Sequence, residues 1–141
     1  MFSKETSLKI ARVTLFLLAI MDLFRGFMHT FNIWHASGNI AKMSQTADTL
    51  QLMNTFGITN FLTAFIFIIV VIKAKDIAPY ILAAIPTAYI IGIISSNITG
   101  VQAMQTSAWR GKYMMFVYLG ITILVSLNYF ISTLRAKKKT V

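Results

Sequence analysis

The sequence predicts an all-α membrane protein, a single domain over residues 1–141 in which four transmembrane helices form an antiparallel bundle. Three observations support this fold class. Of the 141 residues, 57% are hydrophobic and only 12% are charged, whereas a soluble domain carries about 25% charged residues to cover its surface. Four segments are each long and apolar enough to cross a bilayer, and basic residues alternate between the connections that join them.

The four predicted spans cover residues 13–34, 50–72, 77–98 and 113–134. Each holds roughly 20 mostly apolar residues, which at about 1.5 Å per residue cross a hydrocarbon core of about 30 Å. The strands of a β-barrel would alternate apolar and polar residues, whereas residues 65–72 (FIFIIVVI) are continuously apolar. The connections are short, so we expect consecutive helices to lie side by side and antiparallel.

The distribution of lysine and arginine predicts the orientation. One side of the predicted bundle carries nine of them: Lys4, Lys9, Arg12, Lys73, Lys75, Arg135, Lys137, Lys138 and Lys139. The opposite side carries Lys42, Arg110 and Lys112. Because cytoplasmic connections retain positive charge, we expect a multi-pass protein of the cytoplasmic (inner) membrane with both termini in the cytoplasm.

The composition also excludes several classes of function. The chain contains no cysteine, so disulfide frameworks, thiolate metal sites and thiol chemistry are ruled out. The formal net charge of +9 does not indicate a nucleic-acid partner, because the basic residues lie between apolar segments rather than on one solvated face. The lipid bilayer is therefore the expected partner of the surface.

Two of the predicted spans carry stripes of small or hydroxyl-bearing residues. The stripe of the third span consists of Ala84, Ala88, Gly92 and Ser96. The stripe of the second span consists of Thr55, Thr59 and Thr63. Such faces let membrane helices approach closely, so we expect the first stripe to meet another helix, within the bundle or in a second copy. Pro86 predicts a bend in the third span.

The first span holds the residues that say most about function, namely Asp22, Arg25, His29 and Asn32. At about 100° per residue, these four side chains fall within an arc of about 80° on one helix face. A charged group at the bilayer centre costs on the order of 2.5–3.5 kcal/mol. We therefore expect this face to point into the bundle and Asp22 to pair with Arg25.

Groups on the other spans could complete this cluster. We expect Arg25 to donate further hydrogen bonds to backbone carbonyls or to Asn60, and Asp22 to accept one from a tyrosine or threonine hydroxyl. Tyr89 and Tyr118 combine a ring with a hydroxyl and are candidate wall groups. The predicted ligand-binding set or polar cluster is thus Asp22, Arg25, His29, Asn32, Asn60, Tyr89 and Tyr118.

The same residues argue against a cofactor, a metal ion and catalysis. His29 and His35 are six residues apart on one helix, so they face different directions and cannot ligate one haem iron. No carboxylate or second histidine follows His29 at the spacing of a metal site. No nucleophile is paired with a base. We expect no enzyme activity.

Two functions stay open. One is a membrane component that binds or passes a small organic molecule, aromatic or anionic, at the intramembrane cluster of Asp22, Arg25 and His29. The other is a structural or partner-binding subunit in which the ion pair fixes only the helix packing. A cavity that touches Arg25 and His29 would favour the first, and a sealed cluster the second. A second copy of the chain or another membrane protein is a further candidate partner.

The chain resembles the BphX-like family of small bacterial four-helix membrane proteins, which are similar in style to DoxX-type proteins. The resemblance covers most of the chain and rests on residues 21–31 (MDLFRGFMHTF), 39–41 (NIA), 56–63 (FGITNFLT), 85–92 (IPTAYIIG) and 111–115 (GKYMM). It implies an integral membrane protein without an established activity, encoded in some bacteria beside enzymes of aromatic degradation.

Overall fold

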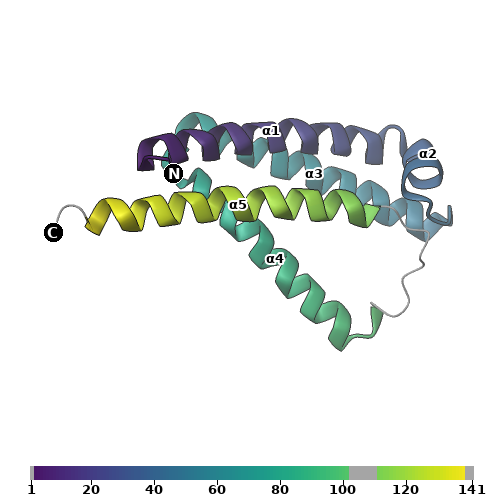
Figure 1. The fold of residues 1–141 in the computed structure, drawn as a ribbon. Helices are drawn as coiled ribbons and strands as arrows, with labels where there is room; N and C mark the ends of the chain where they lie inside the picture. The colour runs from purple at the N-terminus through teal and green to yellow at the C-terminus, as the bar shows by residue number, and fades with distance from the viewer. Residues whose placement is uncertain (1, 102–110, 139–141) are drawn as a thin grey trace.

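A computed structural model of the chain describes residues 2–101 and 111–138, which are almost entirely helical (Figure 1). The four long helices are α1 (Lys4–Thr30), α3 (Ala47–Lys73), α4 (Ala78–Ile98) and α5 (Gly111–Lys138). Three short elements connect them: α2 (Ile33–His35), the π-helical η1 (Ala36–Ala41) and the 3-10 helix η2 (Lys75–Ile77). The predicted connection over residues 99–112 lies largely outside the described residues, as do Arg110 and Lys139.

Three of these helices are long and apolar enough to cross a membrane. They are α3, the segment Lys75–Ile98 that joins η2 to α4, and the Tyr113–Lys138 part of α5. Three of the four predicted spans are therefore confirmed as long apolar helices. The remaining helix, α1, is not among them and carries six charged residues: Lys4, Glu5, Lys9, Arg12, Asp22 and Arg25.

The helix that contains most of the first predicted span, residues 13–34, has different ends from that span. The helix begins earlier, at Lys4, where the Ser3 hydroxyl accepts a hydrogen bond from the Thr6 backbone N–H (3.1 Å) and caps it. It ends at Thr30, because the backbone leaves the helical conformation at Asn32 (φ −122°, ψ 38°).

Both faces of α1 are apolar over most of the helix, apart from the charged residues. The inner face places Ala11, Leu15, Leu18 and Ala19 in the main core, which also contains side chains from α3, α4 and α5. The outer face is a continuous exposed stripe of large apolar side chains: Val13, Phe16, Leu17, Ile20, Phe24, Phe27 and Phe31. The charged pair of Asp22 and Arg25 does not lie on this outer stripe.

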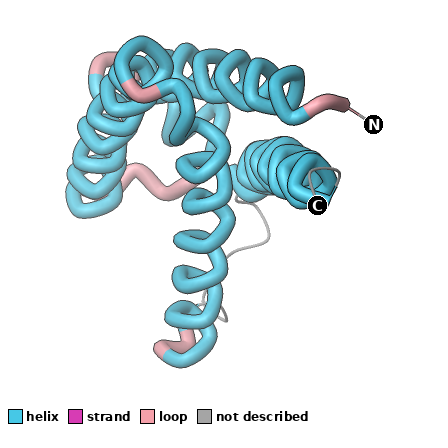
Figure 2. Tube along the Cα trace, turned by 90° about the vertical axis from the view of Figure 1, so that its left-hand side faces the viewer, coloured by secondary structure: helices cyan, strands magenta, loops and turns pink. Residues whose placement is uncertain are grey.

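The helices do not form the regular bundle that short connections predicted. α1 packs most extensively on α3 and also contacts α5 and α4, whereas α4 packs on α5 and α1 rather than on α3. Figures 1 and 2 show α4 leaving the other three helices at an angle. Its buried residues, Ala78, Pro79 and Leu82, all lie in its first turns, and the large isoleucines of its second half are exposed. Small side chains at the start of α4 permit close packing there, and nothing described holds its far end against α3.

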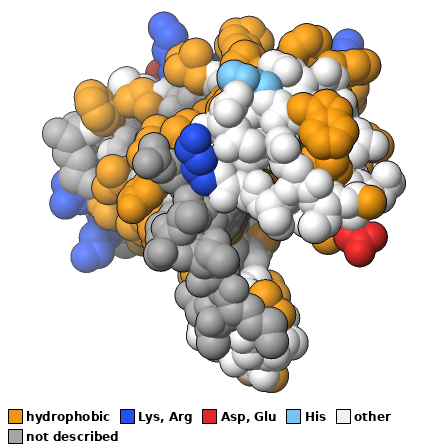
Figure 3. Space-filling model, turned by 90° about the vertical axis from the view of Figure 1, so that its right-hand side faces the viewer, with side chains coloured by type: hydrophobic (Ala, Val, Ile, Leu, Met, Phe, Trp, Pro, Cys, Tyr) orange, Lys and Arg blue, Asp and Glu red, His pale blue; other side chains and the backbone are white. Residues whose placement is uncertain are grey.

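The two ends of the molecule differ in charge. Both termini and the turn between α3 and α4 lie at one end, and α2 and η1 at the other (Figure 1). Eight of the nine basic residues assigned to the cytoplasmic side are described, and all belong to segments at the first end. Figure 3 looks onto the other end, where polar side chains and backbone lie beside hydrophobic ones.

A polar contact joins the first and last helices near the charged end. Ser7 of α1 is fully buried, and its hydroxyl oxygen accepts hydrogen bonds from Asn128 Nδ2 (3.1 Å) and from the Ser132 hydroxyl (2.8 Å) of α5. Side-chain hydrogen bonds of this kind hold membrane helices together, because lipid offers no competing partner. The contact fixes the register of α1 against α5.

Candidate functional site

An ion pair in the second half of α1 forms the centre of the polar cluster. Arg25 Nη1 lies 3.2 Å from Asp22 Oδ1, one helical turn away. Asp22 is only 2% exposed, whereas the Arg25 side chain is 27% exposed. The expected pairing of these two residues is confirmed. The carboxylate is thus enclosed, while part of the arginine side chain remains accessible.

Tyr118 of α5 completes the surroundings of the carboxylate. Its buried hydroxyl donates a hydrogen bond to Asp22 Oδ2 (3.3 Å), so both carboxylate oxygens have a donor. This confirms the expectation that Asp22 accepts a hydrogen bond from a tyrosine or threonine hydroxyl. Hydrogen bonds to a charged group contribute about 1.5–3 kcal/mol, so Tyr118 helps to keep the charge tolerable inside the bundle.

His29 and Asn60 form a second pair one turn further along α1. Asn60 Nδ2 lies 3.2 Å from His29 Nδ1. The amide of α3 thus bonds the imidazole, whereas the sequence predicted Asn60 as a possible partner of Arg25. The His29 ring stacks on Phe56 with the centroids 5.5 Å apart. The Arg25 guanidinium carbon also lies 5.5 Å from the centre of the Phe56 ring, within the range of a cation–π interaction. Phe56, which the sequence interpretation missed, therefore connects the two pairs.

Asn32 does not belong to the cluster. It is exposed beyond the end of α1, and its amide nitrogen lies 3.7 Å from Met28 Sδ. The prediction assumed that helical periodicity continued through residue 32. Because the helix ends at Thr30, that periodicity no longer determines the direction of the Asn32 side chain.

Two glycines allow α1 and α3 to approach closely at this site. A Cβ atom on Gly57 would lie 2.7 Å from Thr30 Cγ2 and 2.9 Å from His29 Cβ. A Cβ atom on Gly26 would lie 2.8 Å from the Phe61 ring. Neither glycine was identified as a site residue from the sequence, although glycine in an apolar helix is a typical sign of a close helix contact.

A cavity of about 200 Å³ lies beside the ion pair. Its lining comes from all four long helices: Asp22, Arg25, Phe56, Thr59, Asn60, Thr63, Phe67, Ile85, Ala88, Tyr89 and Tyr118. Five of the seven predicted site residues are in this set. His29 does not line the cavity, although its partner Asn60 does. A ligand site was expected to touch both Arg25 and His29, and this cavity touches only Arg25.

The two predicted stripes take part in this cavity rather than in tight packing. Thr59 and Thr63 line it from α3, and Ala88 lines it from α4. Ala84 and Ala88 are exposed, and a Cβ atom on Gly92 would meet no described atom within 4 Å. The expectation that the α4 stripe meets another helix is therefore not fulfilled within the described chain. At Pro86, where the sequence predicted a bend, α4 continues as one helix from Ala78 to Ile98.

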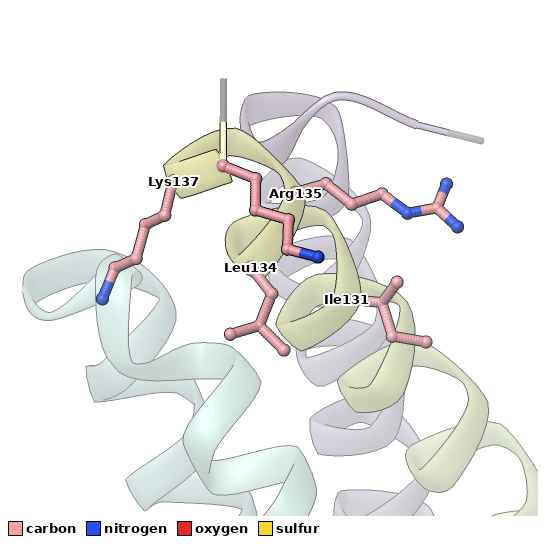
Figure 4. A pocket seen from close by; sticks show the side chains of 5 residues that line it. Ile131, Leu134, Arg135 and Lys137 are labelled. Atoms are coloured by element: carbon pink, nitrogen blue, oxygen red, sulfur yellow. The ribbon is translucent and has the colours of Figure 1, made fainter. Parts of the chain in front are cut away.

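A second hollow lies far from the cluster, at the C-terminal end of α5 (Figure 4). It is wide open and is lined by Ile131, Leu134, Arg135, Lys137 and Lys138. Apolar residues followed by basic ones are typical of a helix that leaves the hydrocarbon core, where long basic side chains reach the headgroups. This hollow shares no residue with the polar cluster.

The arrangement offers hydrogen-bond donors and aromatic walls, and the described residues contain no group of three side chains suited to holding a metal ion. No family model matches the chain, and neither a curated protein nor a solved structure is detectably similar to it. The resemblance to the BphX-like family therefore stays a prediction.

Proposed function

We propose that the chain is a four-span, non-enzymatic membrane protein of the BphX-like type that binds or passes a small organic molecule at the cavity beside Asp22 and Arg25. In this proposal α1 is the fourth span. Its exposed stripe of large apolar side chains suits contact with lipid, and its central charges face away from that stripe. The collection of basic residues at one end supports an orientation with both termini in the cytoplasm.

The observation that carries the ligand proposal is the incomplete use of Arg25. A guanidinium has five N–H donors, and among the described residues that of Arg25 donates to Asp22 alone. Its side chain borders the cavity and is partly accessible. Donors that face hydrocarbon without an acceptor cost free energy, so in a membrane a molecule with an acceptor oxygen would be favoured in this position.

The size of the cavity limits the ligand. An apolar cavity of about 150 Å³ holds a benzene molecule, so about 200 Å³ is enough space for one substituted ring. Phe56, Phe67, Tyr89 and Tyr118 contribute aromatic walls, which suit a flat ligand. A compact single-ring molecule is the ligand class that fits.

The test is thermal unfolding of the purified, detergent-solubilised protein with three single-ring compounds: phenol, benzoate and acetophenone. A ligand present at 100 times its dissociation constant stabilises the native state by about 2.7 kcal/mol. We expect at least one compound to raise the Tm of the wild type. The double variant Asp22→Asn/Arg25→Gln removes the guanidinium without leaving an unpaired buried charge, and it should lose this shift.

A matched control separates the cavity from a general effect of losing an arginine. Arg135 lies 17 residues beyond Tyr118 on the same helix, roughly 25 Å away. The variant Arg135→Gln should therefore keep the full ligand-induced rise in Tm. A shift that persists in the double variant would place the ligand elsewhere.

The alternative is a structural role, which the double hydrogen bonding of Asp22 favours. An ion pair that is satisfied by its own helix and by Tyr118 can fix packing without a ligand. If none of the three compounds changes the Tm of the wild type, this alternative replaces the ligand proposal.

A further inference from the structure

We infer that the ligand of this cavity is electrically neutral and reaches it sideways from the hydrocarbon of the bilayer, through an opening between α3 and α4. This inference rests on the proposed function, and it adds the charge class of the ligand and its route. It follows from three features: which lining residues are exposed, how far they lie from the helix ends, and the net charge of the cavity.

The exposure of the lining residues locates the opening. Asp22, Asn60 and Tyr118 are buried and form the floor. Phe56 and Thr59 of α3 and Ala88 of α4 are exposed, with Phe56 at 48%. The exposed lining residues thus belong to α3 and α4, the two helices that diverge from one another (Figures 1 and 2). The cavity opens to the side of the molecule, between α3 and α4.

The opening lies near the middle of both helices. Thr59 is 12 residues from the start of α3 at Ala47, and Ala88 is 10 residues from both ends of α4 (Ala78–Ile98). At 1.5 Å per residue these separations are about 18 Å and 15 Å, close to half the thickness of the hydrocarbon core. If α3 and α4 cross the membrane, the opening meets the acyl chains rather than water or headgroups.

The charge of the site selects against an anion. Asp22 and Arg25 pair at 3.2 Å and cancel, and among the described lining residues no other carries a formal charge. A bound carboxylate would leave a net negative charge within the hydrocarbon, which costs on the order of 2.5–3.5 kcal/mol. A neutral carbonyl avoids this cost and still accepts from the N–H groups of Arg25 that have no acceptor among the described residues. The ligand class is a neutral single ring with a carbonyl oxygen.

The route is tested by site-directed spin labelling in lipid vesicles, for which the absence of cysteine is an advantage. Nitroxides are attached to Thr59→Cys and Ala88→Cys. Their collision rates are measured with oxygen, which concentrates in hydrocarbon, and with a water-soluble nickel complex. Ile66→Cys, on the exposed apolar face of α3, gives the value for lipid, and Ser44→Cys, before the start of α3, gives the value for water.

We expect both cavity labels to match the Ile66 label, with high oxygen and low nickel accessibility. Nickel accessibility as high as that of the Ser44 label would show a water-filled entrance and overturn the lateral route. Low accessibility to both reagents would show that the opening is covered, and this outcome also overturns it. None of these readings depends on whether a ligand binds, so they are independent of the proposed function.

The charge class is tested with three compounds of similar size: acetophenone, benzoate and ethylbenzene. We expect acetophenone to bind, benzoate to bind on the order of 100-fold more weakly because of its charge, and ethylbenzene to bind more weakly because it cannot accept a hydrogen bond. Dissociation constants come from Tm shifts as a function of concentration. Tighter binding of benzoate would overturn the neutral class and leave the proposed function intact, whereas binding of none would overturn the proposed function itself.

Discussion

Replacing Gly57 with alanine tests the close contact between α1 and α3 that holds the polar cluster together. The added Cβ would lie 2.9 Å from His29 Cβ and 3.1 Å from the His29 carbonyl carbon, whereas ordinary contact begins at 3.4 Å. Because one of these atoms belongs to the backbone, a side-chain rotation cannot relieve the overlap. The two helices must separate by about 0.5 Å, and such overpacking costs roughly 1–3 kcal/mol.

The separation also has a local consequence. The distance of 3.2 Å between Asn60 Nδ2 and His29 Nδ1 would increase beyond about 3.5 Å, where a direct hydrogen bond no longer exists. We therefore expect Asn60→Ala to cost less stability in the Gly57→Ala background than in the wild type.

The matched control is Gly120→Ala. Gly120 is also inside a long helix, but an added Cβ there would meet no described atom within 4 Å. Both substitutions gain the same helix propensity, up to about 1 kcal/mol, so the difference between them isolates the overpacking. It is measured by equilibrium unfolding with SDS in mixed micelles, followed by tryptophan fluorescence. Equal free energies of unfolding for the two variants would refute the close contact at Gly57.

Two further predictions concern the topology and the ion pair. Alkaline phosphatase fused after Val141 should be inactive and a fusion after Ser44 active, because basic residues collect at the end that holds the termini; the opposite pattern would reverse the orientation. The losses of unfolding free energy in Asp22→Asn and in Arg25→Gln should add up to more than the loss in the double variant. The difference, which is the coupling free energy, should be about 0.5–3 kcal/mol from denaturant unfolding. Additive effects would mean that the two side chains do not interact.

Much of the helical structure could be predicted from the sequence, because long apolar segments have few other ways to satisfy their backbone in lipid. The pairing of Asp22 with Arg25 was predictable for a similar reason, since a spacing of three residues lets the two charges meet on one helix. The hydrogen bond from a hydroxyl to Asp22 was anticipated as a class, although the identity of Tyr118 as the donor required the structure.

The features that could not be predicted depend on contacts between helices. The divergence of α4 from α3 depends on which side chains of the two helices contact other helices. A stripe that contains Ala84 and Ala88 has the same sequence pattern whether it packs against a helix, lines a cavity or is exposed. The pairing of Asn60 with His29 depends on the register that Gly57 permits. The wrong assignment of Asn32 to the polar cluster has a local cause. Helix ends are difficult to predict from periodicity, and α1 ends before this residue.

The hydrogen bonds of α1 to α5 impose an order on biosynthesis. Asp22 bonds a residue 96 positions later in the chain, and Ser7 bonds one 125 positions later. A chain that enters the membrane from its N-terminus presents α1 long before α5 exists. During that interval α3 supplies Asn60, only 31 positions from His29, while the Asp22 carboxylate has Arg25 on its own helix. Among the described helices, α5 is the last to be synthesised, and it completes the hydrogen bonding of α1.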